Sequence, residues 1–76
     1  MITLDELKIG STARIIGFSK NERNYRQKLL AMGLTPGCEL QIVRVAPLGD
    51  PVQICIRGFH LSLRKTEAKM IEVEEI

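Results

Sequence analysis

The second half of the chain is a series of short segments in which apolar and polar residues alternate, and this pattern limits the possible folds most strongly. The clearest segments are VQICIR at 52–57 and FHLSLR at 59–64, which Gly58 alone separates. Side chains along a β-strand point alternately to opposite faces, so each segment has one apolar and one polar face. Gly58 therefore predicts a tight reversal or a bulge between two antiparallel strands.

The same reasoning predicts five short strands along the chain. Their ranges are 12–18, 38–46, 52–57, 59–64 and 71–76. In the fourth strand, the alternation directs three apolar side chains inward, those of Phe59, Leu61 and Leu63. The segment PLGDP at 47–51 holds two prolines and a glycine, and it predicts a loop at the tip of a broad hairpin.

One segment, YRQKLLAMGLTPG at 25–37, has helical spacing instead. Tyr25, Leu29 and Met32 fall on one face of a helix near 22–32, and this face is expected to pack inward. Asn21 or Asn24 is expected to cap the start of this helix.

The end of this helix is explained by its own residues. A left-handed Gly33 would stop the helix and let Leu34 fold back on Leu29, as in a Schellman motif. Pro36 and Gly37 match the central positions of a type II turn. Gly33, Leu34, Pro36 and Gly37 are therefore predicted to be structural turn residues that need no ligand.

Two shorter helical turns are also predicted. Thr3 can cap a turn at 4–7, with Glu6 completing a capping box. A single turn at 65–70 is expected to be capped by Thr66.

These elements predict a mainly β protein: a small five-stranded barrel with a helix inserted between the first and second strands. Closing the sheet into a barrel removes exposed strand edges, and the helix is expected to cover one open end. The 76 residues suffice for a single domain, 1–76. Aromatic side chains make up only 4% of the chain, so the core is expected to be aliphatic.

Composition and charge exclude several classes of protein. A net charge of +2, without an aromatic platform beside the basic residues, argues against nucleic-acid binding. Residues 1–18 contain no continuous apolar stretch of a signal peptide, and no segment is long enough to insert directly into a membrane. We therefore expect a cytoplasmic protein with reduced thiols.

The residues that carry chemistry do not form an enzyme motif. His60 is the only histidine, and it falls on the outward face of its strand. Cys38 and Cys55 lie on different predicted strands without the spacing of a metal site. No catalytic residue, cofactor or metal site is therefore predicted.

A surface for a protein partner remains the best functional candidate. Leu48 lies at the tip of the proline-rich loop, while Leu30 lies beside the inward helix face, close to Arg26. Apolar anchors and arginine are enriched at interface centres. The predicted partner-binding residues are Arg26, Leu30, Pro47, Leu48, Gly49, Asp50 and Pro51. An alternative explains the leucines equally well: Leu48 folds back over the barrel mouth, and Leu30 packs beneath the loop at 19–24.

Three segments together resemble the ferrous iron transport protein A family, FeoA. They are YRQKLLAMGLTPG at 25–37, VRVAPLGDPVQICIRG at 43–58 and LSLRKTEAKMIEV at 61–73. The most specific parts are the motifs at 26–37 and 46–51. The resemblance covers about Leu4 to Glu74, and it implies an SH3-like barrel with an inserted helix. It also implies a non-enzymatic, cytoplasmic accessory protein of bacterial ferrous iron uptake.

The expected partner of such a protein is the ferrous iron transporter FeoB, a membrane protein with a cytoplasmic GTP-binding domain. Binding would hold the chain at the inner membrane and modulate the assembly or activity of the transporter. Three alternatives remain. The first is a regulatory module of the iron-dependent repressor type, which binds a protein or a transition metal. The others are a small-ligand binder or enzyme, and weak self-association through the edge of strand 71–76.

Overall fold

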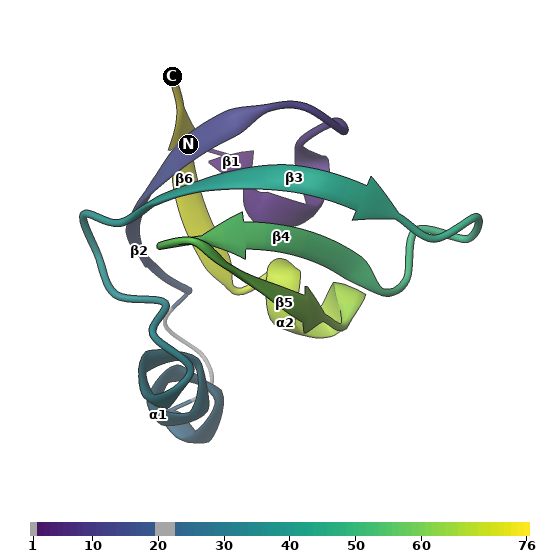
Figure 1. Cartoon of the computed structure of the whole chain (residues 1–76). Coiled ribbons are helices and arrows are strands. Elements are labelled where there is room, and N and C mark those ends of the chain that lie inside the picture. The colour runs from purple at the N-terminus through teal and green to yellow at the C-terminus, as the bar shows by residue number, and fades with distance from the viewer. Residues whose placement is uncertain (1, 20–22) are drawn as a thin grey trace.

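Six antiparallel strands form one curved sheet in the order β1-β6-β2-β3-β4-β5 in the computed structural model, which describes residues 2–19 and 23–76 (Figure 1). The strands are β1 (Ile2–Thr3), β2 (Thr12–Phe18), β3 (Glu39–Val45), β4 (Val52–Ile56), β5 (Phe59–Leu63) and β6 (Ile71–Glu75). The helical elements are η1 (Leu4–Glu6), α1 (Arg23–Ala31) and α2 (Lys65–Ala68). The predicted mainly β class and the helix between the first two predicted strands are confirmed.

The count of five strands is wrong by one. The extra strand, β1, is only two residues long and pairs with β6 through Ile2–Val73 and Thr3–Glu72. Two residues are too few to show an alternating pattern, so this strand exists only through its tertiary partner. Because β6 lies between β1 and β2, it is also not the free sheet edge from which self-association was predicted.

The hairpin between β4 and β5 turns tightly, as predicted. Arg57 and Gly58 both have positive φ angles, 52° and 83°, the conformation of a two-residue hairpin loop that suits the twist of its strands. Phe59, however, is 42% exposed, so its predicted inward position is wrong. It begins the edge strand β5, and its ring lies towards Gly33, where an added Cβ would be 3.6 Å from Phe59 Cζ.

The core inside the curved sheet is aliphatic, as the low aromatic content predicts. The largest fully buried side chains are Leu4, Ile15, Leu29, Leu34, Ile42, Ile54, Ile56, Leu63, Ile71 and Val73. In β4, Val52, Ile54 and Ile56 are buried, and the residues between them are half-buried. Alternation along the sequence therefore predicted correctly which face of this strand lies inward.

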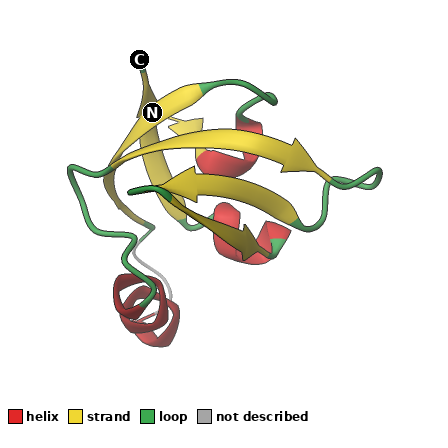
Figure 2. Ribbon diagram, viewed as in Figure 1, coloured by secondary structure: helices red, strands yellow, loops and turns green. Residues whose placement is uncertain are grey.

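Helix α1 projects from one end of the sheet, whereas η1 and α2 lie against it (Figure 2). Of its predicted inward residues, Leu29 is fully buried, Met32 packs partly against the core and Tyr25 is half-buried. The helix is thus anchored mainly near its C-terminal end. Asn24, one predicted cap, lies inside α1, and Asn21, the other, lies outside the described residues.

The end of α1 has the predicted Schellman geometry. The Leu34 N–H donates to the Leu29 carbonyl at 3.1 Å, and the Gly33 N–H donates to the Leu30 carbonyl at 3.0 Å. Gly33 has a φ of 93°, the left-handed conformation that glycine adopts without steric cost. The type II turn that follows is also confirmed, because the Cys38 N–H donates to the Thr35 carbonyl at 3.1 Å and Gly37 has a φ of 93°.

The two short helical turns differ in how well they were predicted. At η1, the Thr3 N–H donates to Glu6 Oε2 at 2.7 Å, which confirms the capping box. At α2, the predicted cap Thr66 is wrong. Arg64 is the N-cap residue, and its N–H donates to Glu67 Oε1 at 2.9 Å. Since β5 ends at Leu63, the helix starts as soon as the strand is complete, and Thr66 falls inside it.

Candidate functional site

The loop at 46–51 joins β3 to β4 and presents Leu48 to solvent. Leu48 is 90% exposed, so the alternative that it folds back over the barrel mouth is wrong. The loop is closed at its base, where the Ala46 N–H donates to the Pro51 carbonyl at 3.1 Å. A second hydrogen bond, from the Gly49 N–H to the Ala46 carbonyl at 2.7 Å, closes the turn that carries Leu48. It is also tied to α2, since Asp50 Oδ1 accepts a hydrogen bond from the Lys65 N–H at 3.0 Å. Leu48 is therefore an apolar side chain held out from an anchored loop.

The other part of the predicted partner-binding surface lies elsewhere. Arg26 is exposed on α1, and Leu30, on the same helix, is half-buried. In Figure 1, α1 and the loop between β3 and β4 lie at opposite ends of the molecule. The seven predicted residues therefore form two separate surfaces, and a partner role for either surface remains a prediction.

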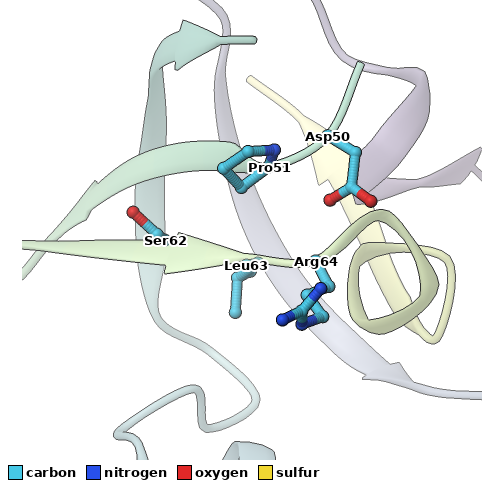
Figure 3. Close-up of a pocket in the computed structure, with 5 residues that line it drawn as sticks. All are labelled: Asp50, Pro51, Ser62, Leu63 and Arg64. Atoms are coloured by element: carbon cyan, nitrogen blue, oxygen red, sulfur yellow. The ribbon is translucent and has the colours of Figure 1, made fainter. Parts of the chain in front are cut away.

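A groove runs beside the loop, and sequence reasoning missed it. One cleft of about 370 Å³ is lined by Asp50, Pro51, Ser62, Leu63 and Arg64 (Figure 3). An adjoining cleft of about 270 Å³ is lined by Arg44, Ala46, Pro47, Pro51, Gln53 and Ser62. The two clefts share Pro51 and Ser62, so we treat them as one surface, the loop groove.

The register of the sheet explains how these residues meet. Gln53 pairs with Arg44 on one side and with Ser62 on the other, so these three residues form a row across β3, β4 and β5. Gln53, Ser62 and Arg64 belong to the polar faces that alternation predicts for segments 52–57 and 59–64. Alternation does not reveal which outward residues become neighbours, because that depends on strand pairing.

The cysteines and the histidine do not combine into one site. Cys38 Sγ lies 2.9 Å from Thr35 Oγ1 and 2.7 Å from Arg57 Nη2. The hydrogen bond with Thr35, together with the Arg57 guanidinium, holds the pKa of the Cys38 thiol below its ordinary value despite partial burial. Cys55 instead pairs with His60 across β4 and β5.

Potential metal-binding side chains form no large cluster in the described residues. Within 2–19 and 23–76, no three or more His, Cys, Asp or Glu side chains lie close enough together to hold a metal ion. No helix in the described part of the chain is long and apolar enough to cross a membrane.

Comparison with known proteins explains the architecture. The family model of the FeoA domain matches residues 2–75. The Fe(2+) transport protein A/Fe(2+) transporter FeoB fusion protein of Porphyromonas gingivalis is 38% identical over 73 residues. The match covers 96% of this chain but only 8% of the fusion protein.

Solved structures agree in both sequence and fold. The FeoA-like protein of Clostridium acetobutylicum is 44% identical with a TM-score of 0.90, and the match covers 99% of this chain and 86% of that one. FeoA of Stenotrophomonas maltophilia, described as a prokaryotic SH3 domain protein and solved in complex with zinc, is 26% identical with a TM-score of 0.83. That match covers 97% of this chain and 91% of the other. Because the family match spans nearly every residue and the fold agrees, this chain belongs to the FeoA family, whose members are SH3-like, non-enzymatic accessory proteins of ferrous iron transport.

Proposed function

We propose that this chain binds the cytoplasmic part of a FeoB-type ferrous iron transporter and modulates its assembly or activity. The observation that carries this proposal is the P. gingivalis relative, in which a FeoA and a FeoB are fused in one protein. Fusion holds two modules at high effective concentration, which favours an interaction between them. In a separate chain, an exposed binding surface has to supply the affinity instead. In this proposal the chain lies in the cytoplasm and reaches the inner membrane through its partner.

The loop at 46–51 is the surface best suited to this docking. Its Leu48 side chain is 90% exposed, so binding can remove nearly all of that side chain from water. Full burial of a leucine contributes about 1.5–3 kcal/mol. That free energy corresponds to roughly a tenfold to hundredfold change in affinity. The hydrogen bond between Asp50 and Lys65 reduces the conformational entropy that the loop loses on binding.

Docking alone does not regulate a transporter. A bound protein shifts the equilibrium between two conformations only when it binds one of them more tightly. We therefore expect the affinity of this chain for the GTP-binding region to depend on the bound nucleotide. The opposite surface, with Arg26 and Leu30 on α1, remains free to contact a second part of a large partner.

The test is a calorimetric titration of this chain into the soluble GTP-binding region of the transporter. It is run with GDP, with a GTP analogue and without nucleotide. We expect binding that differs between these states, and Leu48→Asp is expected to weaken it by roughly tenfold or more. The matched control is Ile9→Asp, because Ile9 is also a large exposed side chain, 62% exposed, but lies outside the loop.

Two results would contradict the proposal in different ways. If Leu48→Asp and Arg26→Glu both bind like the unmodified chain while remaining folded, neither predicted surface is the docking site. If no nucleotide state binds, the titration is repeated with the full-length transporter in detergent. Absence of binding there as well would rule out the transporter as the partner.

A further inference from the structure

We propose that the loop groove binds an extended, acidic segment of the protein partner. This inference rests on the proposed function, because docking on Leu48 brings the partner next to the groove. It goes further by naming the chemistry of the segment that this chain recognises.

The shape of the loop groove suits an extended chain. Its two clefts, of about 370 and 270 Å³, meet at Pro51 and Ser62 and continue along the base of the loop. Proline rings at positions 47 and 51 provide apolar walls that lose little side-chain entropy when a ligand packs on them. Gln53 and Ser62 add side-chain amide and hydroxyl groups, which can hydrogen bond to a peptide backbone.

The charges on the loop groove select acidic side chains. Arg44 lines one cleft and Arg64 the other, and both side chains are exposed. Within residues 2–19 and 23–76, neither arginine forms an ion pair with a carboxylate. An unpaired guanidinium binds a carboxylate through two parallel hydrogen bonds, so the groove offers two such positions.

The surroundings of the groove strengthen this preference. Lys65 directly follows Arg64 and adds a third basic residue next to the groove. The nearest acidic residue after it in the sequence, Glu67, is only 6% exposed and pairs with Lys28 at 3.0 Å. Lys65 Nζ lies over the loop, 3.9 Å from the position that a Cβ on Gly49 would occupy. The one acidic residue in the lining is Asp50, and its carboxylate already accepts the Lys65 N–H at 3.0 Å. The local charge therefore opposes a basic segment and favours an acidic one.

The same observations argue against a nucleic acid as the occupant. The chain carries a net charge of only +2, and no aromatic side chain lines either cleft on which a base could stack. A peptide in extended conformation advances about 3.3 Å per residue, so acidic side chains a few residues apart can reach both arginines.

The experiment is a titration of the isotope-labelled full chain with defined peptides, followed by the NMR shifts of its backbone amides. The probe peptide alternates glutamate and leucine, and the comparison peptide has lysine in place of every glutamate. We expect the acidic peptide to shift the amides of Arg44, Gln53, Ser62 and Arg64, and the lysine peptide to leave them unchanged. Raising the salt concentration should weaken binding, because exposed charges are screened.

Two substitutions then distinguish recognition of the peptide by the groove from an effect of the net charge of the chain. Arg64→Glu is expected to weaken binding of the acidic peptide by about tenfold. Lys8→Glu changes the net charge by the same amount at an exposed turn outside the groove, and it should leave the affinity within about twofold. The dispersion of the amide spectrum shows whether each variant is folded.

Two results would overturn the inference. One is equal binding of the acidic and lysine peptides, or no shift at the groove with either. The other is equal loss of binding in Arg64→Glu and Lys8→Glu. Both are distinguishable from failure of the proposed function. If the transporter binds in a Leu48-dependent way but the acidic peptide does not bind the groove, only this inference fails. If the peptide binds and the transporter does not, only the proposed function fails.

Discussion

Lys28 of α1 and Glu67 of α2 form an ion pair, so we expect their contributions to the free energy of unfolding to be coupled. Lys28 Nζ lies 3.0 Å from Glu67 Oε2, and the other Glu67 oxygen accepts the Arg64 N–H at 2.9 Å. The Glu67 side chain is only 6% exposed, whereas Lys28 is 60% exposed. The nearly buried Glu67 carboxylate is thus stabilised by two groups, the backbone N–H of Arg64 and the solvated ammonium group of Lys28.

The expected magnitudes follow from these exposures. Because Lys28 is largely solvated, its interaction with Glu67 should resemble a strong surface pair, with a coupling energy of about 1 kcal/mol. Glu67→Gln also replaces a charge-assisted hydrogen bond at the N-terminus of α2 by a neutral one. This variant should therefore lower the free energy of unfolding by about 2 kcal/mol.

A double-mutant cycle in urea, followed by circular dichroism, measures both quantities. The variants are Lys28→Met, Glu67→Gln and the combination of the two. The control is Lys69→Met, an exposed lysine just after α2, which should change the free energy of unfolding by less than about 0.5 kcal/mol. A coupling energy of zero within error would refute the reasoning, and so would a Glu67→Gln variant as stable as the unmodified chain.

The pH dependence of the same variants gives a second readout. Burial acts to raise the pKa of Glu67. The hydrogen bonds from the Arg64 N–H and from Lys28, together with the positive charges of the Lys28 and Arg64 side chains, outweigh burial and hold this pKa below 4.5. A folded-state pKa below the unfolded value means that the ionised group stabilises the fold above about pH 4.5. This contribution is lost as the pH falls through the folded-state pKa. The stability difference between the unmodified chain and Glu67→Gln should therefore shrink on acidification.

Two further predictions concern the turn residues and the thiol. Gly33→Ala should lower the free energy of unfolding by about 1 kcal/mol in urea, because Gly33 has a φ of 93° while the added Cβ meets Phe59 at an ordinary 3.6 Å. Gly17→Ala is the control, since Gly17 lies outside the left-handed region, and equal losses would contradict the prediction. Arg57→Asn should slow alkylation of Cys38 by iodoacetamide at neutral pH, because loss of the guanidinium raises the pKa of that thiol. Asparagine tolerates the positive φ at this position, Cys55 serves as the internal reference in mass spectrometry, and an unchanged ratio of the two rates would contradict the prediction.

Local elements were predictable wherever neighbouring residues determine the conformation. The Schellman end at Gly33 and Leu34, and the turn at Pro36 and Gly37, depend on backbone preferences within a few positions. Errors occurred where a distant segment decides the outcome. Phe59 begins an edge strand and therefore stays partly exposed, although its alternation matches that of a buried residue.

The candidate site shows the same division. The prolines placed Leu48 in a loop, but exposure and folding back over the barrel mouth remained equally open until the structure showed it 90% exposed. The separation of Leu48 from Arg26 was not predicted, because only the path of the sheet sends the loop and α1 to opposite ends (Figure 1). The role of Glu67 was also missed. Glu67 pairs with Lys28 of α1, which lies far away in the sequence, so no local pattern reports this contact.

The sequence by itself determined that this chain forms short strands, one helix with a defined end and a loop at 46–51. Alternation, glycine and proline act over a few residues, so these features need no knowledge of the rest of the fold. Only the tertiary structure decided that Arg44, Gln53 and Ser62 align beside Pro51, and that Arg57 approaches Cys38. These contacts between residues distant in the sequence depend on strand register and sheet curvature. Register and curvature in turn follow from packing the whole aliphatic core at once.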